Sequence, residues 1–393
     1  MSNYLIKLTP VGKYFFGGDM TFSVGAKDYP KDWKKLSDTE KTRIKNQIEN
    51  NTRYSSYIIK SEKFPQQTSL LGMLRYLMLR NSPSLFDINK NIIREGEDIK
   101  KLVKDLIGET GFIANDEEKK ENVFGQIKRI SPCFIMNGDN VITQLPMDYG
   151  FEIVDLSGAK QLYNDNAIYL SEIISGRKDN GDKRRYSAKD GIYTRYGDGK
   201  TLYDENEIFI EDHRIGINRN IETGHTEDNA LFKQVNYRLA DGFCFAFYAE
   251  VDMNIKSHSC QIVSLGADNS QFVIQISPSD FHQIALPSSN VKTKGCNGKI
   301  VLTSPALIDK EIAKKADFAM TETIPFKYMK TNIGLNSYHR LSGISHSKKE
   351  YLFQTGSVFY FKSSEKLKDF KDDLENRKDF FQIGYNHFQI VQF

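Results

Sequence analysis

The residues best suited to binding or catalysis gather near the middle of the chain. Two arginines and a lysine stand there among small polar side chains and one histidine. Arginine presents a planar fork of donors that matches a phosphate, and small polar side chains hydrogen-bond to base edges. The spacing therefore predicts a nucleic-acid contact on a β-hairpin. The residues of this set are Arg214, Asn218, Arg219, Thr223, His225, Thr226 and Lys233.

A second candidate site lies in the segment 64–80, just before the apolar helix that this segment predicts. Gln66, Gln67, Thr68 and Ser69 stand before its first turn, and the hydroxyls of Thr68 and Ser69 are suited to N-capping. Free backbone amides and the positive dipole end of a helix also favour a phosphate. Capping alone and phosphate binding both fit this pattern. Arg75, two turns further on, either reaches RNA or forms a surface ion pair.

A basic segment over 177–200 departs from the composition of the rest of the chain. It has eight basic and four acidic side chains, a net charge of +4 that exceeds the +3 of all 393 residues. Three tyrosines (186, 193 and 196) and four glycines accompany the charge, which predicts a flexible basic loop. Clustered cations neutralise phosphates and aromatic rings stack on bases, so nucleic-acid contact and a solvated surface loop are both open.

Other function classes are disfavoured. The four cysteines are scattered singly, and the seven histidines form no HExxH motif, so we expect no metal site and no cofactor, and assign the cysteines to packing. The longest apolar run, 243–249, has seven residues, whereas a membrane helix needs about 20. The first eight residues do not read as a secretory leader, so the expected location is cytoplasmic.

The elements that position these residues form two series. The first has a strand over 3–9, a charged helix over 31–50, the apolar helix, a polar helix within 88–107, and strands over 130–136 and 140–145 joined by an Asn-Gly-Asp turn. After the basic segment the pattern becomes β-rich, with strands over 207–217, 230–239 and 243–253.

Strands with a few helices in two halves indicate an α+β fold of two ferredoxin-like domains rather than a parallel sheet. We expect an N-terminal domain over 1–206, with a helical insertion and the basic loop at about 176–206, and a C-terminal domain over 207–393.

Several stretches, in this order, resemble the RAMP subunits of CRISPR effector complexes, specifically the Cmr-type (type III-B) subunit that holds the 5′ handle of the guide RNA. The most specific is 213–219, where Arg214-Ile215-Gly216-Ile217 is similar to the family's Arg-x-Gly-Ile hairpin. One departure is the single glycine, Gly384, where many RAMPs have a glycine-rich loop. The stretches are 10–22, 64–80, 124–127, 131–135, 145–148, 213–219, 302–306 and 355–360.

The resemblance implies two RRM-like RAMP domains that grip single-stranded RNA by shape and backbone. It implies a non-catalytic subunit that anchors the crRNA 5′ handle in an antiviral ribonucleoprotein. The implied partners are the crRNA, the backbone RAMP subunit, the large signalling subunit and, indirectly, target RNA. The modest net charge agrees with a subunit whose surface is largely covered by protein.

Two alternatives stay open at this point. One is a RAMP endoribonuclease that cuts CRISPR repeat RNA without a metal, with His225 or His213 as general base and Lys233 beside the phosphate. The other is a scaffold without RNA contact, which leaves the basic segment and the Arg214 hairpin unexplained.

Overall fold

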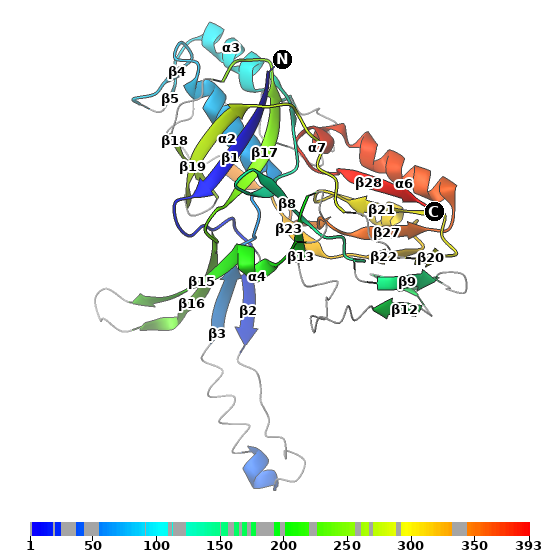
Figure 1. Cartoon of the computed structure of the whole chain (residues 1–393). Coiled ribbons are helices and arrows are strands. Elements are labelled where there is room, and N and C mark those ends of the chain that lie inside the picture. The colour runs from blue at the N-terminus through cyan, green and yellow to red at the C-terminus, as the bar shows by residue number, and fades with distance from the viewer. Residues whose placement is uncertain are drawn as a thin grey trace.

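The chain combines helices with sheets whose strands are mostly antiparallel, which confirms the predicted α+β class. Figure 1 shows its computed structural model. The residues that it describes are 2–18, 20–24, 37–42, 55–90, 92–108, 112, 123–149, 151–155, 161–164, 167–170, 174–177, 192–196, 201–219, 226–255, 261–266, 270–287, 292–331 and 344–393.

A nine-stranded sheet forms the larger body. Its strand order is β14-β13-β8-β7-β17-β1-β19-β18, with β6 also paired to β17. The strands are β1 (Ser2–Pro10), β6 (Ile127–Ile130), β7 (Phe134–Asn137), β8 (Asn140–Gln144), β13 (Ile192–Arg195), β14 (Leu202–Asp204), β17 (Phe243–Val251), β18 (Gln261–Leu265) and β19 (Ser270–Pro278). Strands from both sides of the predicted boundary at residue 206 share this sheet, and the division into two domains stays a prediction.

The core of this body follows from the side-chain periods of its elements. Alternate residues of β1, Tyr4, Ile6 and Leu8, are buried, as a half-buried strand requires. They join one apolar cluster with the buried residues of α2 (Gln67–Arg80), which confirms that the apolar helix is buried. The second helix, α3 (Glu97–Ile107), adds Val103 and Leu106 and is shorter than the predicted 88–107.

A four-stranded antiparallel sheet forms the second body, seen at the right of Figure 1. Its elements follow the order strand, helix, strand, strand, helix, strand, and its strand order is β22-β27-β21-β28. They are β21 (Gly298–Leu302), α5 (Lys310–Ala313), β22 (Phe318–Met320), β27 (Val358–Phe361), α6 (Ser364–Asn376) and β28 (Phe388–Gln392), with α7 (Lys378–Gln382) after α6. Leu367, Phe370 and Leu374 of α6 pack against one face of this sheet.

A third sheet carries the predicted hairpin. It consists of β15 (Phe209–Arg219), β16 (Thr226–Leu239), β3 (Ser55–Lys60) and β2 (Met20–Val24), and β16 runs parallel to β3. The short helix α4 (Glu205–Ile208) leads into β15. Smaller pairings are β4 (Phe86–Asp87) with β5 (Ile92–Ile93), β9 (Phe151–Asp155) with β12 (Ile174–Arg177) and β20 (Lys292–Lys294), β10 (Gln161–Asn164) with β11 (Ala167–Leu170), β23 (Thr323–Phe326) with β26 (Glu350–Phe353), and β24 (Met329–Thr331) with β25 (Ile344–His346).

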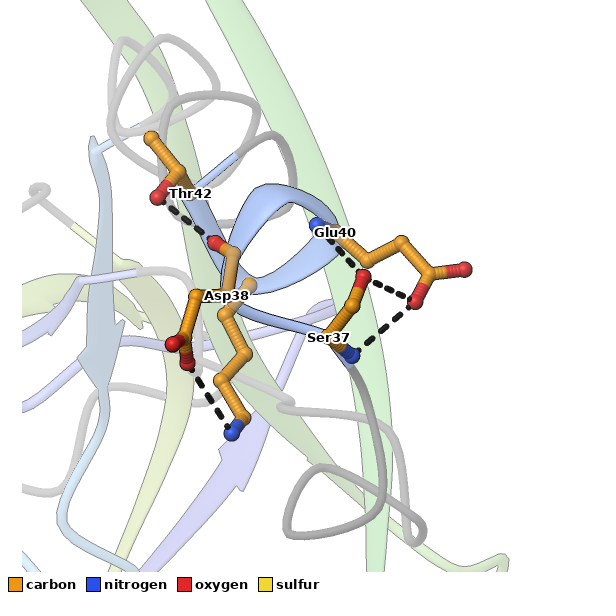
Figure 2. A network of polar contacts seen from close by, with 5 residues as sticks. Ser37, Asp38, Glu40 and Thr42 are labelled. Carbon is orange, nitrogen blue, oxygen red and sulfur yellow. Dashed lines mark hydrogen bonds and ion pairs between the residues drawn. The ribbon is translucent and has the colours of Figure 1, made fainter.

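Of the helix predicted over 31–50, the structure describes residues 37–42, and 38–42 are helical. Figure 2 shows the polar network that begins it: the Ser37 amide donates to the Glu40 carboxylate at 3.0 Å, and the Glu40 amide donates to Ser37 Oγ at 3.3 Å. This reciprocal capping box satisfies backbone groups of the first turn. Hydrogen bonds from Ser37 hold the pKa of Glu40 below its ordinary value.

None of the helices described is long and apolar enough to span a membrane. Across the same ranges, His, Cys, Asp and Glu side chains form no group of three that is placed to hold a metal ion.

Candidate nucleic-acid interface

A cleft of about 460 Å³ is bordered by segments that lie far apart in the sequence. Five of the eight stretches that carry the family resemblance contribute to its walls. Those wall residues are 64–67, 132–134, Met147, Thr303, Pro305 and Thr355, joined by Lys60, Tyr237 and Tyr385 among others. The fold therefore gathers these stretches around one cavity.

The N-terminus of α2 lies at this cleft and is capped from the other end of the chain. The Gln67 amide donates to the Tyr385 hydroxyl at 3.1 Å, and the amides of Ser69 and Leu70 bond to the Gln66 carbonyl. Gln66 is the N-cap residue, and its side chain makes no capping bond. The prediction of a hydroxyl cap from Thr68 or Ser69 is therefore wrong, and the Gln67 amide is taken by Tyr385 rather than left for a phosphate.

Gln67 itself is a buried connector. Its Nε2 donates to the carbonyls of Ser131 and Gly384, each at 3.2 Å, so its side chain ties α2 to two distant loops. At 3% exposure, this side chain is poorly placed for the predicted RNA contact. Gly384 has φ +92°, and a Cβ on it would lie 2.5 Å from Gln67 Nε2 and 2.7 Å from the Ser131 carbonyl. The single glycine of this loop is thus needed for packing.

The other members of this group are more accessible. Gln66, Thr68 and Ser69 are half-buried, and Gln66 lines the cleft. Their contact with RNA stays a prediction.

Arg75 of α2 contacts the segment that precedes β6. Its Nη2 donates to the Val123 carbonyl at 3.2 Å, and its guanidinium lies 5.9 Å from the centre of the Phe124 ring. Burial lowers the pKa of Arg75 to about 10. The two predicted roles of Arg75, an RNA contact and a surface ion pair, stay predictions. No atom lies within 4 Å of a Cβ added at Gly72, one turn earlier, so no other backbone approaches this glycine closely.

A buried ionic group fixes the wall of the cleft at Met147. The next residue, Asp148, forms an ion pair with Lys299 of β21 and accepts a hydrogen bond from the Tyr360 hydroxyl of β27 at 2.6 Å. The Lys299 and Asp148 side chains are 1% and 0% exposed. Burial, and then the charge of Asp148, raise the pKa of Tyr360, so its hydroxyl stays protonated and donates. The Met147 amide also bonds to the Gly356 carbonyl at 2.8 Å.

The two lysines at the cleft form ion pairs. Lys60 bonds to Glu211 at 2.8 Å, and Lys63 forms an ion pair with Glu205. The hydrogen bond from Lys60 holds the pKa of Glu211 below its usual range. Both ammonium groups lie about 6 Å from the centre of the Tyr237 ring, at 5.8 and 6.0 Å.

The predicted hairpin exists as β15 and β16, which extend away from the nine-stranded sheet (Figure 1). Arg214 is exposed and lies opposite Gln234, and Lys233 lies opposite Ile215. Because directly paired residues share a face and neighbours alternate, Arg214 and Lys233 are on opposite faces. The structure thus divides the predicted set between two surfaces.

At the end of the hairpin, the structure describes the backbone only. Arg219 pairs with Thr226, and the register shifts between Ile217 and Arg219, which places Asn218 in a bulge. Bulges redirect side chains at the edges of sheets. The predictions at Thr223 and His225 fall outside the described residues.

The basic segment over 177–200 is described only at 177 and over 192–196. Tyr193, one of its three tyrosines, is buried on β13 within the main apolar cluster, so its assignment to a flexible loop is wrong. Tyr196 is 47% exposed. The remainder of the segment lies outside the described ranges.

The sequence analysis did not single out four residues that the fold places at the cleft. Tyr385, Lys60, Thr143 and Thr303 line the cleft, but each belongs to a strand or loop whose pattern indicates only packing. The sequence signals for two of them were Pro305, two residues after Thr303, and Gly384, next to Tyr385.

The chain is similar to one protein family and to subunits of solved complexes. A family model described as CRISPR-associated protein (Cas_Cmr3) matches residues 169–393. One solved structure, "Cryo-EM structure of the Type III-B Cmr-beta bound to cognate target RNA", aligns with 98% of this chain and 96% of its own at 15% identity and a TM-score of 0.45. The same complex with AMPPnP, state 1, aligns over the same shares at 14% identity and a TM-score of 0.45. No curated protein matches the chain.

Proposed function

The chain belongs to the Cas_Cmr3 family of CRISPR-associated proteins, and from this we propose that it is a non-catalytic RNA-binding subunit of a type III-B (Cmr) effector complex. In this proposal it anchors the crRNA 5′ handle and joins the backbone RAMP subunit to the large signalling subunit. Target RNA is contacted indirectly, through the guide. The family match over more than half of the chain is the observation that carries the proposal.

The hairpin supports RNA binding by its geometry. Arg214 is exposed on an extended ribbon, beside the amide of Gln234, which donates to Asn236 at 3.2 Å. A cation next to ordered amide groups suits a phosphate backbone with polar base edges nearby.

The strand orders support the finer part of the fold proposal, two ferredoxin-like units. The four-stranded sheet has the β-α-β-β-α-β succession and places its fourth strand beside its first. The central strands of the larger sheet, β19-β1-β17-β7, are antiparallel throughout in the corresponding order. In this second unit, β18 stands between β17 and β19, where the β-α-β-β-α-β order has its second helix.

The decisive experiment is to tag the protein in its native host, purify it gently and sequence the RNA that accompanies it. Small RNAs that share one fixed 5′ handle followed by varied spacers are expected. RNA without a shared handle, or no RNA, would refute the anchoring role.

A variant then tests the contact. Arg214→Ala with Arg219→Ala should weaken guide-RNA binding and reduce the slope of log K against log salt by about 1.4, because each lost phosphate contact on a single strand contributes roughly 0.7. The control is Lys368→Ala with Lys378→Ala, which removes two exposed cations from α6 and α7 and should leave the slope unchanged. Equal slopes for the two double variants would count against the hairpin.

One observation favours the endoribonuclease as a second candidate. His213 and Lys233 lie on one face of the hairpin, diagonally across β15 and β16, and His213 Nε2 lies 3.3 Å from Glu211. This places a base, a cation and an orienting carboxylate together. Cleavage of repeat RNA in chelator that is lost in His213→Ala would favour this function, and intact RNA with the wild-type protein would reject it.

A further inference from the structure

The nine-stranded sheet has a second face, on the side away from α2. Residues of β17 alternate between the two faces: Phe245 and Phe247 join the core with α2, whereas Tyr248 joins a separate apolar cluster with Phe134 of β7. The rings of Tyr248 and Phe134 lie 5.5 Å apart on neighbouring strands in the middle of the sheet. In RRM domains, aromatic rings on the sheet stack bases of single-stranded RNA. This face therefore has the rings of a stacking surface.

The chain's own linker, residues 279–287, lies on this face. It follows β19 and forms neither helix nor strand. Phe281 packs against the cluster with its ring centre 5.9 Å from that of Tyr248, and the His282 ring stands edge-on to Tyr248 at 5.5 Å. Tyr248 and Phe134 are each only 6% exposed. A base therefore cannot stack on Tyr248 while the linker is in place.

The contacts of Phe281 are those that a stacked base makes. The guanidinium carbon of Arg129 lies 3.8 Å from the centre of the Phe281 ring, so this ring contacts both a cation and the ring of Tyr248. Arg129 also forms an ion pair with Glu250, two residues after Tyr248 on the same strand. RNA bases stack on aromatic rings and on arginine planes in the same way. The linker thus occupies the groups that a base would use.

Hydrogen bonds hold the two ends of the linker. The Ser279 amide donates to the Asn3 carbonyl at 3.1 Å, where the linker leaves β19. At the other end, the Gln389 side chain of β28 accepts from the Leu286 amide and donates to the Leu286 carbonyl, each at 3.1 Å. Between these ends, Phe281 and Ile284 pack against the cluster. The position of the linker over Tyr248 therefore depends on its apolar side chains and on Gln389.

We propose that the linker is an autoinhibitory element that keeps single-stranded RNA off this face, with Phe281 in the place of a base. The inference goes beyond the proposed function, because it concerns a surface that the hairpin contacts do not include. Stacking on aromatic rings tolerates any sequence, so an open face would bind RNA non-specifically and compete with a specific contact elsewhere. The linker removes this competition.

The test is Phe281→Ser in the full chain, which removes the ring but keeps the length of the linker. The probe is a short oligouridine, which has no handle sequence, and its affinity is compared with that for the wild type. The variant should bind roughly tenfold more tightly, a gain within the range for one base stacked on an aromatic ring. Adding Tyr248→Leu should return the affinity to the wild-type value. An unchanged affinity in Phe281→Ser, or a gain that survives Tyr248→Leu, overturns the inference.

Phe353→Ser is the matched control. Phe353 is also partly buried, and its ring contacts the buried ring of Phe359 at 5.4 Å in the second body. Like Phe281, it does not line the cleft. The control should lower the melting temperature without a gain in oligouridine binding. Equal gains in the two variants would show that general loosening is the cause, and would overturn the inference.

Two further measurements apply if Phe281→Ser does not fold. Gln389→Ala removes both hydrogen bonds to Leu286 and should give a smaller gain in oligouridine binding; no gain in the folded variant overturns the inference. Oligouridine that contains photoreactive thiouridine should crosslink to Tyr248 in Gln389→Ala but not in the wild type, and a crosslink to Tyr248 in the wild type overturns it. A native complex without handle-bearing RNA would refute the proposed function but leave these results unchanged, because the probe has no handle.

Discussion

Lys299→Met should destabilise the protein far more than the loss of a surface ion pair does. The variant keeps the length of the side chain but removes the ammonium group that neutralises Asp148. Both residues are almost wholly buried, so water cannot replace the lost partner. Asp148 keeps the hydrogen bond from the Tyr360 hydroxyl.

The structure sets the expected size of this effect. Removing one partner of a buried pair costs about 3–5 kcal/mol, and the remaining bond from Tyr360 places Lys299→Met near the lower end, at about 3 kcal/mol. A domain of 150–250 residues loses roughly 2–4 °C per kcal/mol, so the melting temperature should fall by about 6–12 °C. Adding Asp148→Asn removes the unpaired charge and should recover more than half of the loss.

The assay is thermal unfolding of the three proteins at one pH and salt concentration. Lys366→Met is the control, because Lys366 pairs with Asp317 at 3.0 Å but is 45% exposed, and such pairs contribute up to about 1 kcal/mol. If Lys299→Met melts no lower than Lys366→Met, or if Asp148→Asn gives no recovery, the reasoning from burial is refuted.

Three further predictions use the melting temperature as their measurement. Gly384→Ala should destabilise the protein far more than Gly17→Ala. Both glycines have positive φ, but only a Cβ at 384 meets neighbouring atoms. Equal losses of melting temperature would contradict this, because positive φ alone would then explain both. Gly72→Ala should stabilise α2 by up to about 1 kcal/mol, because its site is exposed and open, and a lower melting temperature would contradict this. Burial lowers the pKa of His387 to about 4, below the ~6.5 of an unfolded chain, so the unfolded state alone binds a proton between these values. Stability should therefore fall by up to about 3 kcal/mol from pH 6.5 to pH 4, and His387→Gln should flatten this dependence; a parallel pH profile would refute it.

Local patterns in the sequence predicted the elements correctly where one segment decides its own structure. The Asn-Gly-Asp turn gave the β7–β8 hairpin because Gly138 takes φ +59°, and the alternation over 3–9 gave β1. The apolar helix and the long strands of the second half are also confirmed.

The site was less predictable because its contacts join distant segments. Tyr385 caps a helix 318 residues away, and Asp148 meets Lys299 across 151 residues. Neither contact leaves a periodic signal. Tyr193 was misassigned for the same reason: an aromatic ring in a polar segment predicts exposure, but its tertiary neighbours bury it.

The place of β1 in the larger sheet has a consequence for synthesis on the ribosome. Its two neighbours are β17 and β19, so Ile6 pairs with Phe247 on one side and with Ile276 on the other. The first strand to emerge therefore has no native partner until about 250 residues have been translated. Both of its edges lack their native strand partners throughout that interval, which favours slow folding and association with other chains. Nascent chains halted before residue 243 should thus depend on chaperones, whereas chains that extend past residue 278 should not.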